Sequence, residues 1–124
     1  MRTFATGATR DIDTDKLDFE GFTSPLVTKR FAEYMHQHRK QADGNLRASD
    51  NWQKGIDKEA YAKSLVRHVE DFKLHWDHYP NEAIDKDFES VLCAIMFNVN
   101  GMLFETIKSR LNQQTGEPGS VVKF

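Results

Sequence analysis

The stretch DFESVLCAIMFNVNGMLFETIKSRLN, residues 87–112, decides how this chain folds. Asp87 can cap a helix whose apolar residues recur at helical spacing and cover more than one face. Such a helix needs neighbours on several sides, so we expect it to be central in an all-α bundle that a dimer or tetramer completes. Gly101 lies inside this helix and costs about 1 kcal/mol relative to alanine. A close approach of a neighbouring backbone or ligand would explain it.

Two further helices are predicted upstream. Ser24 and Pro25 form a good helix start, and the apolar spacing extends the first helix over about residues 25–41. Asp57 can cap the second helix, which Pro80 stops.

Three polar segments surround these helices. Residues 1–23 read as a mostly irregular polar arm, and residues 113–124 read as a tail. The loop over residues 41–55 is too long for a hairpin turn, and loops of that kind often carry function. Residues 1–124 are expected to form a single domain.

Composition excludes several classes of protein. The 124 residues carry a net charge of -2, which argues against a large phosphate-backbone footprint, so polymeric nucleic acid is not an expected partner. A single cysteine, Cys93, fits a reducing compartment. No apolar run approaches about 18 residues and no signal peptide is evident. We expect a cytoplasmic protein, in the host cytoplasm if phage-encoded, without a membrane partner.

A polar row marks the second predicted helix. Its members follow at steps of four, three, four and three residues, which places them on one side of a helix. Imidazoles around a carboxylate, beside an apolar row, suit a metal-dependent or acid–base site in a helical bundle. The row consists of Ser64, His68, Asp71, His75 and His78.

Each member of this row also has a structural interpretation. His68 is either a packed histidine or a functional one. Asp71 is interpreted as a residue that orients an imidazole or binds a divalent cation. His75 and His78 suit the negative end of the helix dipole.

Other polar residues extend the candidate site. Glu33 either forms exposed salt bridges or projects into the bundle toward Asp71, where Mg²⁺ would find oxygen ligands. Glu70 is most simply a solvated residue. On the third helix Glu89 and Asn98 are of interest. A small and polar row there leaves room for a ligand or serves helix packing: Ala94, Asn98, Gly101 and Glu105.

Standard motifs for other chemistry do not occur. The sequence has no HExxH, no CxxC, no P-loop, no GxGxxG and no GxSxG. These absences argue against a structural zinc site. They favour, for any phosphate chemistry, a mechanism in which Mg²⁺ or Mn²⁺ neutralises phosphate oxygens and activates a water.

Short segments in the same order resemble the phage dATP/dGTP diphosphohydrolase N-terminal family. Together they cover roughly residues 5–110. They are GATRD (7–11), DKLDF (15–19), SPL (24–26) and RFAEYM (30–35), then NWQKGI (51–56), SLVRH (64–68) and LCAIMFN (92–98).

This resemblance implies a MazG-like helical bundle with pyrophosphohydrolase activity. Such an enzyme cuts a deoxypurine triphosphate, dGTP or dATP, between its α and β phosphates and releases the monophosphate and pyrophosphate. Members occur in bacteriophages, some of which replace adenine by 2-aminoadenine, and there dGMP feeds synthesis of the modified nucleotide.

The resemblance also suggests site residues. MazG-type enzymes usually carry ExxE on one helix and ExxD on the next, where this chain has Glu33 followed by His36 and His68 followed by Asp71. We expect Glu33, His68 and Asp71 to form the catalytic core, with one or more Mg²⁺ or Mn²⁺ ions bound by carboxylates. The expected metal ligands are Glu33, Glu70, Asp71 and Glu89.

The expected substrate contacts come from the loop, the third helix and the arm. Trp52 offers an aromatic face and Lys54 a point charge, although Trp52 could instead anchor the core. Lys16 could close over the phosphates, across a subunit boundary, or be ordinary surface charge. The expected substrate-binding residues are Arg10, Lys16, Asn51, Trp52, Lys54 and Asn98.

A rival interpretation has no catalysis. The chain would then be a phage accessory module that binds a nucleotide or a protein partner, and its histidines would merely be packed.

Overall fold

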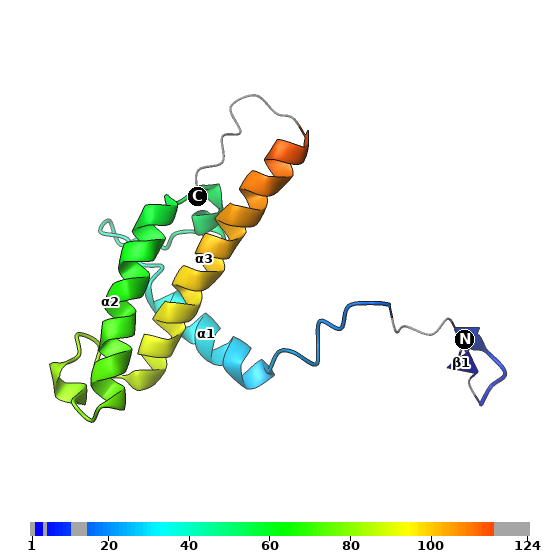
Figure 1. Cartoon of the computed structure of the whole chain (residues 1–124), viewed down its shortest axis with the longest axis horizontal. Helices are drawn as coiled ribbons and strands as arrows, with labels where there is room; N and C mark the ends of the chain where they lie inside the picture. The colour runs from blue at the N-terminus through cyan, green and yellow to red at the C-terminus, as the bar shows by residue number, and fades with distance from the viewer. Residues whose placement is uncertain (1, 4, 11–14, 116–124) are drawn as a thin grey trace.

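A computed structural model describes residues 2–3, 5–10 and 15–115 of the chain. Over this part the chain is all-α, as predicted, apart from a two-residue antiparallel ladder between β1 (Arg2–Thr3) and β2 (Thr9–Arg10). Helices α2 and α3 lie side by side and antiparallel, and α1 crosses the first half of α3 (Figure 1). The helical elements are α1 (Pro25–Gln37), η1 (Asn51–Lys54), α2 (Lys58–Trp76), η2 (Pro80–Glu82) and α3 (Phe88–Thr115).

The starts of α1 and α2 are those predicted from the sequence. The Ser24 hydroxyl accepts a hydrogen bond from the Leu26 backbone N–H at 3.3 Å, and the Asp57 carboxylate accepts one from the Glu59 backbone N–H at 3.2 Å. Both side chains therefore satisfy a backbone donor that the first turn of a helix leaves free.

The end of α1 differs from the prediction. The helix stops at Gln37 rather than near residue 41. Beyond it the Arg47 backbone N–H donates to the Arg39 carbonyl at 2.8 Å, and Lys40 pairs with Leu46 in an isolated β-bridge. The chain thus turns back on itself, and this closes the loop against the end of α1.

The end of α2 also comes earlier than predicted. The helix ends at Trp76, and His78 has a φ of 70°, so it lies outside the helical row. The His78 backbone N–H bonds the His75 carbonyl at 3.2 Å and the Tyr79 backbone N–H bonds the Leu74 carbonyl at 2.7 Å. This is a Schellman ending, and it stops the helix before Pro80 is reached.

The core is small and lies between α2 and α3. Its buried apolar residues include Tyr61 on α2 and Val91, Cys93 and Ala94 on α3. Burial raises the pKa of the Tyr61 hydroxyl and of the Cys93 thiol. The Tyr61 hydroxyl is buried without a hydrogen-bond partner among the described residues.

Gly101 makes the close packing of α2 on α3 possible. A Cβ atom at this position would overlap the ring and hydroxyl of Tyr61. The close approach expected from the sequence is therefore made by an aromatic side chain rather than by a backbone.

Helix α1 is attached mainly through charge. None of its residues is buried. Arg30 donates to Glu89 at 2.7 Å and to Asp87 at 2.9 Å, both at the start of α3. The hydrogen bond from the Ser90 hydroxyl, and then Arg30, lower the pKa of Asp87.

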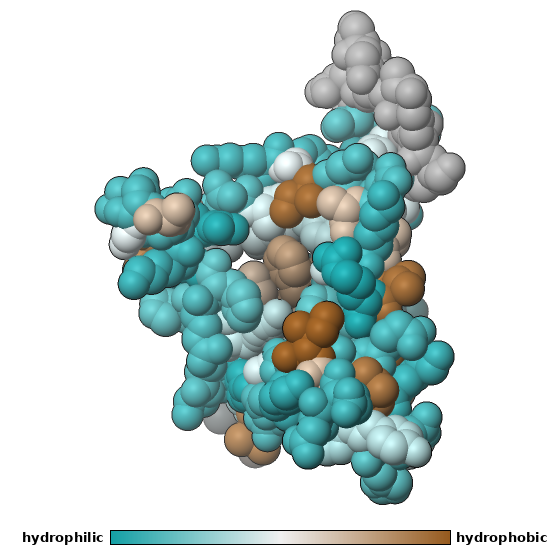
Figure 2. Space-filling model, turned by 90° about the vertical axis from the view of Figure 1, so that its left-hand side faces the viewer, coloured by the Kyte–Doolittle hydropathy of each residue, from teal (hydrophilic) through white to brown (hydrophobic). Residues whose placement is uncertain are grey.

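Much apolar surface stays exposed. The face in Figure 2, on the side where α2 lies in Figure 1, is mainly hydrophilic with separate hydrophobic patches. By length and composition alone, residues Phe88–Gln114 are long and apolar enough to cross a membrane. The sequence analysis found no such stretch because it looked for an unbroken apolar run, and polar residues such as Asn98 and Asn100 interrupt this one.

Replacing Gly101 by alanine is expected to destabilise the protein. The new methyl group must displace the Tyr61 ring, and overpacking of this kind costs about 1–3 kcal/mol, more than the roughly 1 kcal/mol gained in helix propensity. Urea unfolding followed by circular dichroism measures the difference. Asn100→Ala, at an exposed neighbouring position, is the control and should change stability by less than about 0.5 kcal/mol. A more stable Gly101→Ala protein would contradict the packing described here.

Candidate functional site

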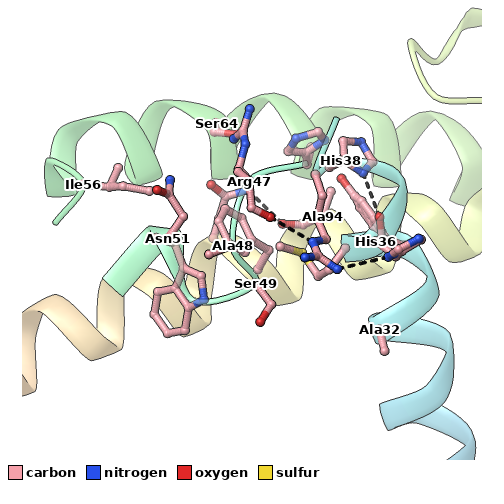
Figure 3. A pocket seen from close by; sticks show the side chains of 17 residues that line it. Ala32, His36, His38, Arg47, Ala48, Ser49, Asn51, Ile56, Ser64 and Ala94 are labelled. Atoms are coloured by element: carbon pink, nitrogen blue, oxygen red, sulfur yellow. Dashed lines mark hydrogen bonds between the residues drawn. The ribbon is translucent and has the colours of Figure 1, made fainter. Parts of the chain in front are cut away.

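A cavity of about 650 Å³ lies where α1, the following loop and η1 meet α2 and α3. In Figure 3, His36 and His38 lie at its α1 end, Asn51 and Ile56 lie at its η1 end, and residues 47–49 lie between them. The side chains that line it are Ala32, Tyr34, Met35, His36, His38, Arg39, Arg47, Ala48, Ser49, Asn51, Trp52, Ile56, Ser64, His68, Ala94, Phe97 and Asn98.

The α1 end of the cavity is held by an arginine. The Arg39 Nε donates to the Arg47 carbonyl at 3.0 Å, and its Nη1 lies 3.4 Å from His36 Nδ1 (Figure 3). Arg39 therefore fixes the loop to the helix. Arg47 lines the cavity and is itself exposed to solvent.

His38 is oriented by its own helix. Its Nδ1 lies 2.8 Å from the Tyr34 carbonyl, which can only accept, so Nδ1 carries a proton. The imidazole also stacks edge-on against the Tyr34 ring at 4.3 Å. Burial raises the pKa of the Tyr34 hydroxyl, with smaller contributions from Asp85 and Cys93. Nε2 of His38 is left as the ring nitrogen that a ligand can use.

The loop residues of the motif Asn51–Lys54 divide into two groups. Trp52 lines the cavity and packs edge-on against Phe104 at 4.9 Å, so it both anchors the loop and offers ring surface. Asn51 also lines the cavity, whereas Lys54 is exposed and does not. The Ile56 backbone N–H donates to Glu105 on α3 at 3.3 Å, which fixes the end of this loop.

The polar row of α2 is split by the structure. Ser64 and His68 line the cavity. Asp71 is buried and its two oxygens accept hydrogen bonds from the backbone N–H groups of Ile84 and Asp85, at 2.9 and 3.0 Å. His75 Nε2 lies 2.8 Å from the Asp85 carbonyl. The second half of the row thus fixes the connection between α2 and α3.

The polar row of α3 is split in the same way. Ala94 and Asn98 line the cavity and are buried, and the Asn98 amide donates to the Ala94 carbonyl at 2.8 Å. Gly101 accommodates Tyr61, and Glu105 holds the Ile56 amide. Only the first two members of the row therefore face a space that a ligand could fill.

The predicted metal ligands lie apart from one another. Glu33 is exposed on α1, Glu70 pairs with Lys73 at 3.3 Å, and Glu89 pairs with Arg30. Over the described residues, no group of three or more His, Cys, Asp or Glu side chains is placed to hold a metal ion. Within one chain the four predicted ligands, Asp71 included, do not fit a divalent cation.

The described residues 15–23 of the arm do not line the cavity, and they run away from the bundle (Figure 1). Lys16 is exposed. The side chain of Arg10 lies outside the described residues.

The lining of the cavity is rich in donors. None of its described residues is Asp or Glu, although the chain as a whole is slightly acidic. The lining contains two arginines, three histidines, two asparagines and the aromatic rings of Trp52 and Phe97. Such a lining suits an anion that carries a flat aromatic group.

Sequence reasoning missed the cationic side of this site. His36, His38, Arg39 and Arg47 belong to no spaced motif. The available signal was that His36, His38 and Arg39 directly precede the long polar loop and Arg47 lies within it. A possible role of this loop in function was predicted.

Comparison of the chain with protein-family models, with curated proteins and with solved structures gives no match.

Replacing Asp71 by asparagine is expected to lower stability by about 1–3 kcal/mol, because the amide nitrogen that replaces one carboxylate oxygen is a donor and leaves the backbone N–H of Ile84 or Asp85 without an acceptor. Thermal unfolding measures the loss. Glu70→Gln, at the exposed neighbouring residue, is the control and should change stability by less than about 0.5 kcal/mol. Equal melting temperatures for Asp71→Asn and the wild type would exclude this structural role.

Proposed function

We propose that this chain binds a deoxypurine nucleoside triphosphate in the cavity between α1, η1, α2 and α3. One observation supports this most strongly. Separate segments that carry the family resemblance contribute to the same cavity: Trp52 from NWQKGI, His68 from SLVRH and Asn98 from LCAIMFN. Segments far apart in sequence thus contribute neighbouring side chains to one space.

The basic residues of the cavity suit the phosphates. Arginine offers a planar pair of donors that matches phosphate oxygens, and hydrogen bonds to a charged group are about twice as strong as neutral ones. Arg47 is the better phosphate ligand, because Arg39 already donates to the Arg47 carbonyl and contacts His36. The Ser49 hydroxyl, two residues further along the same loop, adds a donor to the lining.

The aromatic and amide residues of the lining suit the base. Trp52 and Phe97 provide aromatic surface, and the side-chain amides of Asn51 and Asn98 offer both donors and acceptors to a purine edge. A volume of about 650 Å³ lies within the usual range of small-ligand sites.

The activity proposed for this site is hydrolysis to the monophosphate and pyrophosphate, in phage nucleotide metabolism. The family resemblance supports it. A divalent ion, Mg²⁺ or Mn²⁺, is proposed to arrive with the triphosphate, since the carboxylates of a single chain do not gather at the cavity. The chain's own part is to bind and orient the phosphates through Arg47, Arg39 and the histidines.

A non-catalytic nucleotide-binding module is the second candidate. The absence of Asp and Glu among the described lining residues favours it, because general-base and metal-dependent hydrolysis both use such groups.

Replacing Arg47 by alanine is expected to weaken dGTP binding about 10- to 150-fold, because one charge-assisted hydrogen bond contributes about 1.5–3 kcal/mol. Isothermal titration with dGTP measures the dissociation constant in the presence of EDTA, so that binding is read without turnover. Arg67→Ala removes the same charge from an exposed position on α2 that does not line the cavity, and it should bind as the wild type does. Equal weakening by both variants, or by neither, would refute the assignment of the cavity.

Incubation of the wild-type chain with dGTP or dATP, with Mg²⁺, Mn²⁺ or EDTA, tests the proposed activity. The expected products are the monophosphate and pyrophosphate, formed only with metal. Binding without turnover would establish the non-catalytic module instead. Release of orthophosphate would contradict pyrophosphohydrolysis.

A further inference from the structure

We propose that His38 is the general base of the hydrolysis proposed for the cavity, with Nε2 of its ring as the atom that takes a proton from the attacking water. The inference rests on that proposed function and names the group that completes it. No sequence motif marks His38, and its role follows from the hydrogen bonds around it.

The two histidines at the α1 end of the cavity are held in opposite tautomers. His38 Nδ1 lies 2.8 Å from the Tyr34 carbonyl oxygen, so it carries a proton, and Nε2 of the neutral ring holds a lone pair (Figure 3). His36 Nδ1 lies 3.4 Å from Nη1 of Arg39. A guanidinium can only donate, so Nδ1 of His36 accepts and its Nε2 carries the proton. One ring therefore offers an acceptor to a ligand, and the other offers a donor.

The acceptor on His38 differs from the other basic groups of the lining. Arg39 and Arg47 present only donors, and neutral His36 presents a donor through Nε2. Phosphate oxygens are themselves acceptors, so they match these donors and not the lone pair of His38. A lone pair at this place suits a group that has a proton to give. In the hydrolysis of a triphosphate, that group is the attacking water.

His38 is also the best-oriented proton acceptor of the cavity. Asp and Glu do not occur among the described residues of the lining. His68 lines the cavity too, but no hydrogen bond to another described residue orients its ring. A general base is typically oriented by a third group, and the Tyr34 carbonyl does this for His38. His38 is exposed, so water reaches it.

Three contacts fix the position of this imidazole before a ligand binds. Besides the hydrogen bond to the Tyr34 carbonyl, the Tyr34 ring lies edge-on to the imidazole, with centroids 4.3 Å apart and an interplanar angle of 68°. The His38 backbone N–H donates to the Met35 carbonyl at 3.1 Å and so caps the end of α1. A base that is already in place does not have to be ordered during the reaction, and this favours proton transfer.

The proposed step moves one proton and exchanges one bond at phosphorus. The water oxygen forms a bond to the α-phosphorus, and the bond from that phosphorus to the oxygen shared with the β-phosphate breaks. Pyrophosphate leaves with the electron pair of the broken bond. His38 Nε2 takes a proton from the water and later releases it to solvent. Proton transfer to a positioned base typically contributes about 10²–10⁴-fold to the rate.

This step is expected to depend on pH, because a protonated imidazole cannot accept a proton. Histidine ordinarily changes charge between about pH 5 and 8. Burial raises the pKa of the Tyr34 hydroxyl, so among the described neighbours only the other histidines titrate in the same range. The described residues of α3 that line the cavity carry no charge. The titratable or charged groups that share the cavity with His38 are Tyr34, His36, Arg39, Arg47 and His68.

Replacing His38 by asparagine tests the assignment, because the new amide can still donate to the Tyr34 carbonyl but places no base at the position of Nε2. With dGTP and Mg²⁺, we expect kcat to fall by about 10²–10⁴-fold and KM to change by less than about threefold. We also expect the fall of wild-type kcat below about pH 6.5 to disappear. A fall in kcat smaller than tenfold, or an unchanged pH profile, overturns the proposal.

The matched control is His78→Asn. His78 does not line the cavity, and its φ of 70° is one that asparagine adopts readily. This variant removes the same side chain from another place, so it should keep the kcat and the pH profile of the wild type. Equal loss of kcat in both variants overturns the assignment to His38.

Nitrogen NMR of the metal-free chain tests the tautomers without turnover, and it applies even if His38→Asn fails to fold. Long-range proton–nitrogen spectra at pH 8 report which ring nitrogen carries the proton, and we expect Nδ1 in His38 and Nε2 in His36. A His38 ring protonated on Nε2 overturns the general base while the proposed hydrolysis stands. A wild-type chain that binds dGTP but shows no turnover with metal overturns the hydrolysis and the general base together.

Discussion

The carboxylate of Asp71 is the constraint on which the rest of the structure depends. Its two oxygens bind consecutive backbone amides, of Ile84 and Asp85, and so fix the turn that reverses the chain between α2 and α3. Once that turn is set, Tyr61 meets Gly101 further along the same pair of helices. The two contacts act together. The hydrogen bonds of Asp71 hold α2 and α3 close at one end, and the helices can stay close further along only because Gly101 leaves room for the Tyr61 ring. The small core follows from this geometry.

The cavity is a consequence of how the remaining chain is attached to this pair. Helix α1 buries none of its residues and is held by Arg30 at the start of α3, while the loop after it is held by Arg39 and by the bond between Ile56 and Glu105. A segment that is fixed at a few points, by these polar contacts and by the packing of Trp52 on Phe104, leaves space beneath it. Arg39, which makes one of these contacts, lines that space together with Arg47, so a residue that fixes the loop also contributes to the cationic character of the cavity.

The sequence predicted the all-α class and both N-caps, because helical periodicity and capping are local signals. It did not predict how the polar row of α2 divides. All four residues of this row lie on one side of α2. Ser64 and His68 line the cavity, whereas Asp71 and His75 bind the connection to α3. The difference arises because the surroundings of each helical turn are set by segments that are distant in the sequence. The same reasoning applies to the acidic residues predicted to bind a metal. Glu70 pairs with Lys73 and Glu89 pairs with Arg30, so the two carboxylates do not come together.

The two sides of α3 differ in what they contact. The inner side meets the Tyr61 ring at Gly101 and lines the cavity with Ala94 and Asn98. Small residues are needed there, because a larger side chain at Gly101 would displace the ring and a larger one at Ala94 would fill part of the cavity. The opposite side carries Leu92, Met96, Val99 and Leu103, which remain 39–56% exposed. The inner contacts do not by themselves require these apolar residues, because a helix that packs on one side needs only one apolar face.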